Sequence, residues 1–382
     1  MAEESPRPVI LTELMRFACA LAVMAYHYGV GFWRLPGDHP APLLAGIGYI
    51  SPIERQLQFG WLGVEIFFVI SGLVIMRSLD GVSATTFARR RVLRLAPAAW
   101  ICATVTFVLV GAAGGFDRAL LASYARGLTF WPVGVLIDGS YWTLGIEIAF
   151  YGAVTISLAT GGRAARVEAL AIAIGLASLT FWLVCTMAGT VGAALVGSRM
   201  LALLLLKHGC FFALGAMIAR CQADRITPMR LLVIAMMVGG GSMEVAVHAI
   251  ESANNTGMPR AIGTALLLLM AAVALLAASD RVQERLGRWI APSTARAVGL
   301  ATYPLYLLHQ DAGAALTALA VRVGVAPGVA LIATAAVMIG AAGLIARTAE
   351  PMVRSHLRRL LGLNPRHAPP PDSPPTASLR AG

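Results

Sequence analysis

The sequence predicts an all-α integral membrane protein with about ten transmembrane helices and both termini in the cytoplasm. Three observations support this prediction. The chain of 382 residues is 58% hydrophobic and only 13% charged, whereas a soluble domain of this length needs far more charge to cover its surface. Apolar stretches long enough to cross a bilayer recur along nearly the whole chain. Arginines interrupt these stretches in the pattern that topology signals follow.

Each predicted helix is a stretch of roughly 20 mostly apolar residues, which is the length that spans a bilayer. The stretches lie near residues 10–30, 60–79, 97–115, 141–160, 167–190, 200–220, 229–250, 260–279, 297–320 and 327–347. The apolar connection 117–140, which contains Trp131 and Pro132, is expected to be interfacial or re-entrant. We therefore expect one membrane domain over residues 1–360 and a Pro-rich, disordered cytoplasmic tail over residues 361–382.

The net charge of +11 follows membrane topology rather than a nucleic-acid-binding pattern. If the N-terminus is cytoplasmic, every loop on that side carries at least two arginines, and the opposite loops together carry fewer. The densest group falls between the second and third helices and comprises Arg77, Arg89, Arg90, Arg91 and Arg94. This bias supports an even number of helices, and it makes nucleic acid a poor candidate partner.

Ionisable side chains within the predicted helices are the main functional signal. Such groups cost several kcal/mol in lipid, so they usually face each other or a water-filled cavity. The predicted topology places several of them at one depth in the outer half: His27, Glu65, Glu147, Lys207, His208, Glu244, His248, His309 and Asp311. A lone histidine could simply hydrogen-bond a neighbouring helix, but this convergence predicts a shared polar chamber. For Lys207, Glu244 and His248, structural and functional roles remain equally open.

Arg16 and His27 share one face of the first helix, because they are 11 residues, or nearly three turns, apart. The spacing puts a permanently charged anion binder roughly 16 Å from a titratable base. A transferase that takes an anionic donor from the cytoplasm could use this arrangement, and so could a transporter. The five scattered cysteines show no CxxC pair and no metal-ligand spacing, so we expect no bound metal.

Five sequence blocks resemble acyltransferase family 3, whose members O-acylate sugars and other acceptors. The blocks are Arg16 with His27, GVEIFFVISG at 63–72, RRVLRLAP at 90–97, WTLGIEIAFY at 142–151 and YPLYLLH at 303–309. Each block alone is weak, but five in family order over residues 11–309 are specific. The similarity is closest to members that modify exopolysaccharide or lipopolysaccharide. The extracytoplasmic esterase-like domain fused to some members is not found here, which leaves open a separate transferase partner.

The resemblance implies a donor, an acceptor and a location. The donor is acyl-CoA, most often acetyl-CoA, and it is a co-substrate rather than a permanently bound cofactor. The acceptor is a hydroxyl group of a carbohydrate or glycoconjugate. The location is the bacterial cytoplasmic (inner) membrane, so the lipid bilayer is a further partner.

The resemblance also implies roles for individual residues. His27 is the general base or a transient acyl carrier, and Glu147 or Glu65 orients its imidazole. The residues implied in donor binding are Arg16, Arg90, Arg91 and Arg94, and those implied in shaping the chamber or placing the acceptor are Ser71, Trp142, Tyr303 and His309. The arginines could instead serve only as topology signals, and Tyr303 and His309 could be purely structural.

Two other functions remain open at this point. A proton-coupled transporter or flippase would use the same intramembrane His and Glu residues. The lack of internal repeats and the cytoplasmic arginine block weigh against it. The unrelated class of membrane-bound O-acyltransferases also uses an intramembrane histidine, but its motifs differ from those found here.

Overall fold

The computed structural model describes residues 10–35, 40–79, 81–161 and 164–362, and this part of the chain is helical with no strand. The first half comprises α1 (Ile10–Tyr26), the π-helix η1 (His27–Gly31), α2 (Phe32–Arg34), η2 (Ala41–Leu44), α3 (Glu54–Leu57), α4 (Leu62–Arg77), α5 (Ala84–Gly114), α6 (Arg118–Thr129), η3 (Gly139–Tyr141), α7 (Trp142–Ala159) and α8 (Ala164–Met187). The second half comprises α9 (Gly189–Val196), α10 (Arg199–Leu203), α11 (Gly209–Ala223), α12 (Pro228–Thr256), α13 (Ile262–Ala277), α14 (Ser279–Leu286), α15 (Pro292–Leu308), α16 (Asp311–Arg322), α17 (Pro327–Arg347) and α18 (Ala349–Leu360).

Seven helical stretches in the described residues are long and apolar enough to cross a membrane. They are Ile10–Arg34, Glu54–Arg77, Ala84–Gly114, Gly139–Ala159, Ala164–Met187, Pro228–Thr256 and Pro327–Leu360. Of the other three predicted helices, two correspond to the shorter apolar helices α11 and α13, and the third is divided between α15 and α16. A total of ten spans and the cytoplasmic location of both termini stay predictions, and the expected tail lies mostly outside the described residues.

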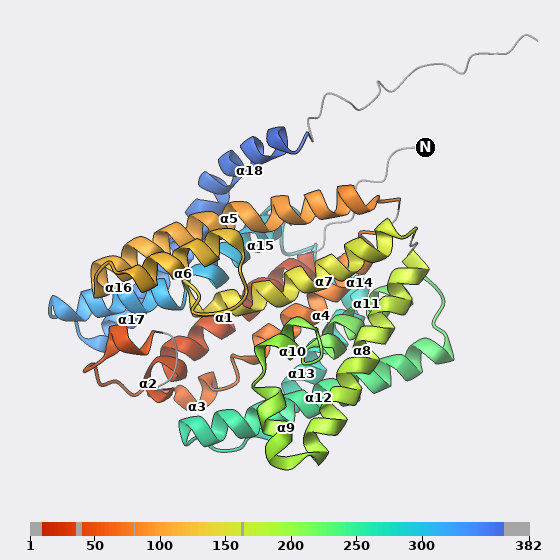
Figure 1. Cartoon of the computed structure of the whole chain (residues 1–382), viewed down its shortest axis with the longest axis horizontal. Coiled ribbons are helices and arrows are strands. Elements are labelled where there is room, and N and C mark those ends of the chain that lie inside the picture. The colour runs from red at the N-terminus through yellow and green to blue at the C-terminus, as the bar shows by residue number, and fades with distance from the viewer. Residues whose placement is uncertain (1–9, 36–39, 80, 162–163, 363–382) are drawn as a thin grey trace, which may run out of the picture.

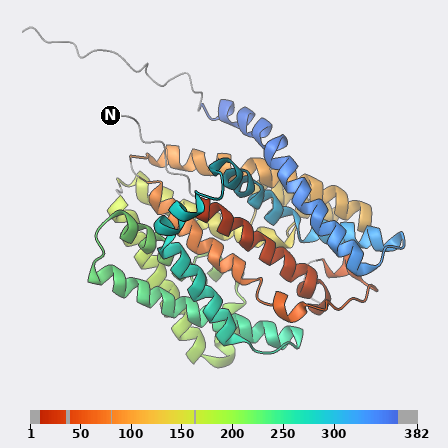
Figure 2. The same cartoon turned by 180° about the vertical axis from the view of Figure 1, so that it is seen from behind.

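The helices form three groups, which the two opposite views make clear (Figures 1 and 2). Helices α1, α4, α7 and α11 occupy the centre. Helices α5, α6, α16 and α17 cover one flank, and α8, α9, α12 and α13 cover the other. Helix α4 packs against α11 and α1, and α1 packs against α15. The central helices carry five of the eleven residues expected in the site, namely Arg16, Glu65, Ser71, Trp142 and Glu147.

The predicted start of the third helix at residue 97 was wrong. Helix α5 begins 13 residues earlier, at Ala84. The Ser83 hydroxyl caps it by accepting a hydrogen bond from the Thr86 amide at 3.2 Å, and Phe87 anchors the first turns in the core. The helix continues through Pro97, because packing on both sides of this residue outweighs the lost backbone hydrogen bond. The arginine-rich segment is therefore helical rather than a loop.

The predicted connection 117–140 contains α6, which lies along α5 and is absent from the spanning stretches of the described residues. The Trp100 indole donates to the Leu128 carbonyl at 2.9 Å, and the Thr104 and Tyr124 hydroxyls are 2.9 Å apart. The chain then returns through residues 130–138 to the start of α7. This segment carries Asp138 to the interior, where the carboxyl is fully buried.

Two predicted helices are interrupted at a buried histidine. The stretch 200–220 breaks between Leu203 and Gly209, where Leu205 has a φ of 64°, in the left-handed region. The stretch 297–320 breaks between α15 and α16. Irregular backbone at membrane depth is tolerated where it is buried in protein or lines a cavity, which is consistent with the burial of both histidines.

Two glycines let α4 and α11 cross closely. A Cβ atom at Gly72 would meet the Phe212 carbonyl, and one at Gly215 would meet the Val69 carbonyl. Small residues permit this approach of helix backbones within a membrane. The crossing brings the middle of α4 against the beginning of α11, and therefore against the interruption that precedes α11.

Candidate functional site

His27 lies where α1 changes into the π-helix η1. Single π-turns inside helices are rare and occur often at functional sites. The turn is held by the Trp33 indole, which donates to the Tyr28 carbonyl at 2.7 Å. The His27 ring packs 5.2 Å from the ring of His309, centre to centre. The structure therefore brings together two histidines from opposite ends of the sequence.

His309 occupies the interruption between α15 and α16 and is fully buried. Its Nδ1 atom lies 2.8 Å from the Tyr306 carbonyl oxygen. Because a carbonyl oxygen can only accept, Nδ1 carries the proton in this contact. The ring is thereby oriented by the last turn of α15.

Two buried carboxylates stabilise the backbone around this interruption. Asp138 accepts hydrogen bonds from the Asp311 amide at 2.9 Å and from the amide and hydroxyl of Ser140 at 2.9 and 2.6 Å. Asp311 accepts one in return from the Gly139 amide at 2.6 Å. This exchange ties the start of α16 to the segment before α7, and so it positions His309.

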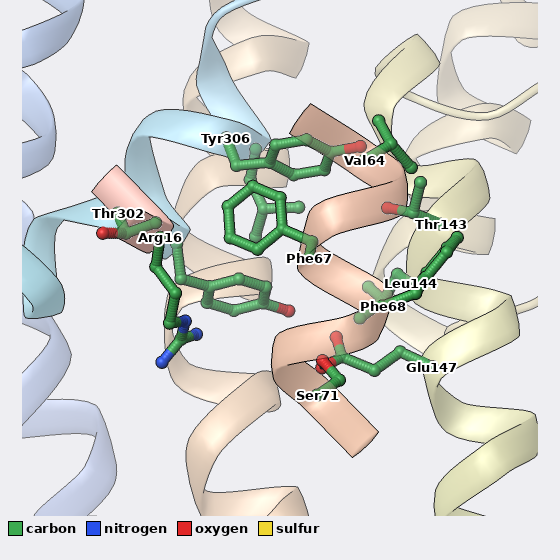
Figure 3. Close-up of a pocket in the computed structure, with 12 residues that line it drawn as sticks. Arg16, Val64, Phe67, Phe68, Ser71, Thr143, Leu144, Glu147, Thr302 and Tyr306 are labelled. Carbon is green, nitrogen blue, oxygen red and sulfur yellow. The ribbon is translucent and has the colours of Figure 1, made fainter. Parts of the chain in front are cut away.

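A cavity lies among α1, α4, α7 and α15 (Figure 3). Its polar lining consists of Arg16, Ser71, Thr143, Glu147, Thr302, Tyr303 and Tyr306, and its apolar lining of Val64, Phe67, Phe68, Leu144 and Leu307. Tyr306 contributes to the wall, and its ring lies 5.6 Å from that of His309. Tyr306 therefore stands between this cavity and the histidine pair.

Glu147 is held at the cavity wall by two hydroxyl groups. Ser71 donates to its Oε1 atom at 3.2 Å, and the Tyr151 hydroxyl donates to the same atom. Glu147 and Ser71 face each other across the space between α7 and α4 (Figure 3). Arg16 projects into the same cavity from α1 and lies 3.9 Å from Glu13.

A second, smaller cavity shares Arg16, Ser71 and Glu147 with the first and adds Arg91, Arg94 and Tyr151. The Arg91 guanidinium donates to the Ser78 hydroxyl at 3.0 Å and lies over the rings of Phe87 and Tyr151, at 4.8 and 5.4 Å. The two cavities adjoin at these shared residues, and the smaller one, next to α5, is lined by three arginines. Phosphate groups and carboxylates are the ligands that such arginines bind well.

Three residues expected in the site lie elsewhere. Arg90 is exposed on α5, outside the two cavities. Trp142 packs its ring 5.5 Å from that of His208. Glu65 faces the same histidine, with its Oε2 atom 3.4 Å from the His208 Nδ1 atom.

A comparison with protein-family models matches residues 12–347 to the acyltransferase domain of acyltransferase family 3. The match covers nearly the whole chain. The chain belongs to acyltransferase family 3. The resemblance inferred from the five sequence blocks is therefore confirmed, and this family member is a multi-pass membrane acyltransferase. No curated protein and no solved structure matched the chain.

Sequence reasoning overlooked several residues that shape the site of this acyltransferase. Tyr151 and Tyr306 lie inside two of the quoted blocks, but their contacts with Glu147 and His309 depend on packing. Asp138 had a weak local signal, since Asp-Gly-Ser directly precedes a predicted helix and aspartate is a common N-cap. Its reciprocal contact with Asp311 joins residues 173 positions apart in the sequence, so no local pattern could reveal it.

Proposed function

We propose that this membrane acyltransferase moves an acyl group, most simply acetyl, from acyl-CoA to a hydroxyl group of a carbohydrate or glycoconjugate. The proposal rests mainly on one observation. The cavity that Arg91 and Arg94 line shares three residues with the cavity that Tyr306 lines, and ring contacts join Tyr306 to His309 and His309 to His27. The cationic end of the cavities would therefore connect with the fully buried His309 and the partly buried His27.

The donor would bind with its phosphate groups at the cationic end. Arg91 and Arg94 come from α5 and Arg16 comes from α1. The three guanidinium groups could therefore contact a polyanion from two sides. The thioester arm would then extend between α1, α4 and α7 toward Tyr306. Arg90 would act at the surface, where an exposed arginine attracts an anionic donor before it enters.

The transfer step needs a base at the acceptor hydroxyl. In one version, His27 takes the hydroxyl proton while the hydroxyl oxygen attacks the thioester carbonyl. The carbon–sulfur bond then breaks, and the imidazolium returns the proton to the leaving thiolate. In the other version, the His27 imidazole attacks the thioester first and passes the acyl group to the hydroxyl afterwards. Both versions release free CoA and a new ester.

Other residues would position the reactants. His309 packs against His27 and has its own ring fixed by the Tyr306 carbonyl, so it would hold the catalytic imidazole in place. Glu147 accepts two hydroxyl hydrogen bonds at the cavity wall, which suits a role in orienting Ser71 and Tyr151. Phe67, together with Tyr303, offers ring surface against which a sugar could pack.

The location and the partners are also proposals. The arginine-rich segments favour a bacterial cytoplasmic membrane in which the cationic end of the cavity faces the cytoplasm, where acyl-CoA is available. The histidine pair would then lie toward the opposite face, where a surface glycan or a separate extracytoplasmic transferase could receive the acyl group.

The test is an assay with purified protein in liposomes and isotopically labelled acetyl-CoA. The expected result is release of free CoA that depends on a glycan acceptor, with the label recovered in an ester. Mass spectrometry of surface glycans from cells with and without the protein would identify the acceptor. Movement of a substrate across the membrane without any CoA-dependent product would contradict the proposal and favour the transporter alternative.

A further inference from the structure

A second buried histidine cluster lies apart from the proposed acyl path. It joins Glu65 from α4, Glu244 from α12 and His208 from the interruption before α11. The His208 Nδ1 atom is 2.5 Å from Glu244 Oε1 and 3.4 Å from Glu65 Oε2. The three side chains are only 4–6% exposed, and one ligand atom from each lies within 4.8 Å of the others.

Hydrogen bonds and ring contacts hold the interruption before α11 in place. The Lys207 carbonyl accepts hydrogen bonds from the Trp182 indole at 2.8 Å and from the Ser178 hydroxyl at 3.2 Å. The rings of Phe68 and Trp142 pack against the His208 ring at 5.0 and 5.5 Å. The cluster is therefore enclosed by aromatic rings and held on a fixed backbone.

Two buried carboxylates meet a single imidazole at contact distance in this cluster. Glu65 Oε2 and Glu244 Oε2 are buried without a hydrogen-bond partner among the described residues. Lys207 acts on Glu244 from a distance and makes no ion pair within 4 Å among the described residues, so at contact distance one imidazole faces two carboxylates. Burying an uncompensated carboxylate is very costly, especially at membrane depth. A bound cation would remove this cost.

We propose that Glu65, His208 and Glu244 bind a divalent metal ion of the zinc class. Imidazole nitrogen and carboxylate oxygen are ordinary zinc ligands, with bonds of about 2.0–2.2 Å. Two carboxylates, one neutral imidazole and one Zn²⁺ sum to zero charge, which suits an apolar environment. His208 Nδ1 lies 2.5 Å from Glu244 Oε1, and metal binding would displace any proton held on that nitrogen.

The position of the cluster indicates what the metal would do. Its ligands come from α4, α12 and the start of α11, so the ion would fasten three helices together. Phe68 lies in the cavity wall and also packs on His208, which places the metal behind that wall rather than in the acyl path. The inference is therefore independent of the proposed acyl transfer.

The test uses the full chain, purified in detergent with a histidine-free affinity tag and stripped with a chelator. Zinc chloride is then titrated in, and the bound metal is measured by mass spectrometry after gel filtration. We expect about one zinc ion per chain and a higher melting temperature in zinc, because a ligand that binds only the folded state stabilises it. Magnesium should produce neither effect.

Two separate variants, His208→Gln and Glu244→Gln, should bind zinc about 100-fold more weakly or worse. They should also lose the zinc-dependent rise in melting temperature. The matched control is His356→Gln, because His356 is an exposed histidine on α18 whose ring is hydrogen-bonded to the Met352 carbonyl of its own helix. If either variant fails to fold, Glu65→Gln replaces it. Absence of zinc binding by the native chain, or unchanged binding in the folded variants, would overturn the proposal.

Discussion

The two interrupted helices differ in what their nearby carboxylates contact. At the interruption before α11, Glu65 and Glu244 contact the histidine side chain itself. At the interruption between α15 and α16, Asp138 and Asp311 accept hydrogen bonds from backbone amides. The first arrangement gathers negative charge around an imidazole, whereas the second uses negative charge to satisfy the ends of helices.

This difference teaches that a buried His and two acidic residues do not define one chemistry. Carboxylates that contact the ring create a place for a cation. Carboxylates that contact the backbone fix the position of a histidine without binding its ring. His309 is in the second situation and packs on His27, so the acyl-transfer proposal belongs to that interruption.

The largest expected effect is on the histidine pair. His27→Ala should lower the acyl-transfer rate by about 10²–10⁴-fold, because a positioned acid–base group contributes that much to a rate. The measurement is the rate of CoA release with a glycan acceptor. The control is His356→Gln, which removes an exposed histidine far along the chain and should keep the native rate. A correctly inserted His27→Ala protein that acylates at the native rate would refute the assignment.

The second prediction concerns the cationic end of the cavity. Replacing Arg91 and Arg94 together by alanine should raise the KM for acetyl-CoA about tenfold or more, because each charged hydrogen bond contributes about 1.5–3 kcal/mol. Zinc binding at His208 should stay unchanged. Arg89→Ala is the matched control, since Arg89 is exposed on the same helix and lies outside both cavities. Equal KM values in the two proteins would rule out the donor-binding role.

A smaller effect on the acyl-transfer rate is expected when Asp138, which accepts hydrogen bonds from backbone amides, is replaced. Asp138→Ala leaves the Asp311 and Ser140 amides without their acceptor, at a cost of about 1–3 kcal/mol per buried group. We expect kcat to fall while the KM for acetyl-CoA stays nearly constant. Asp138→Asn keeps one side-chain oxygen and should recover part of the rate. A purely structural role would lower stability in both variants without this recovery of kcat.

The smallest effect is expected at the crossing of α4 and α11, which lies next to the interruption before α11. Gly215→Ala would push a methyl group against the Val69 carbonyl, and overpacking of this kind costs about 1–3 kcal/mol. The melting temperature in detergent should fall, and zinc binding should weaken because α4 and α11 move apart. Gly239→Ala on α12 is the control, since a Cβ atom there meets nothing within 4 Å. Equal melting temperatures would show that the crossing tolerates a wider separation.

Part of the fold and the site could be predicted from the sequence because the signals are local. Apolar length located the helices, and the order of five short blocks identified the family. Arg16, Ser71, Glu147 and Tyr303 do line one cavity, as the predicted chamber requires. Glu65 and His309, predicted at one depth, instead belong to different clusters, since depth along the membrane says nothing about the direction a side chain faces.

Composition and motif order were sufficient to establish a helical membrane acyltransferase, because bilayer thickness sets helix length and backbone polar groups require helices there. Only the tertiary structure decided where the helices break and which buried charges meet. His208 and His309 look alike in the sequence, each a histidine within a predicted transmembrane helix. Their roles separate because long-range packing brings carboxylates to the ring of one and to the backbone beside the other.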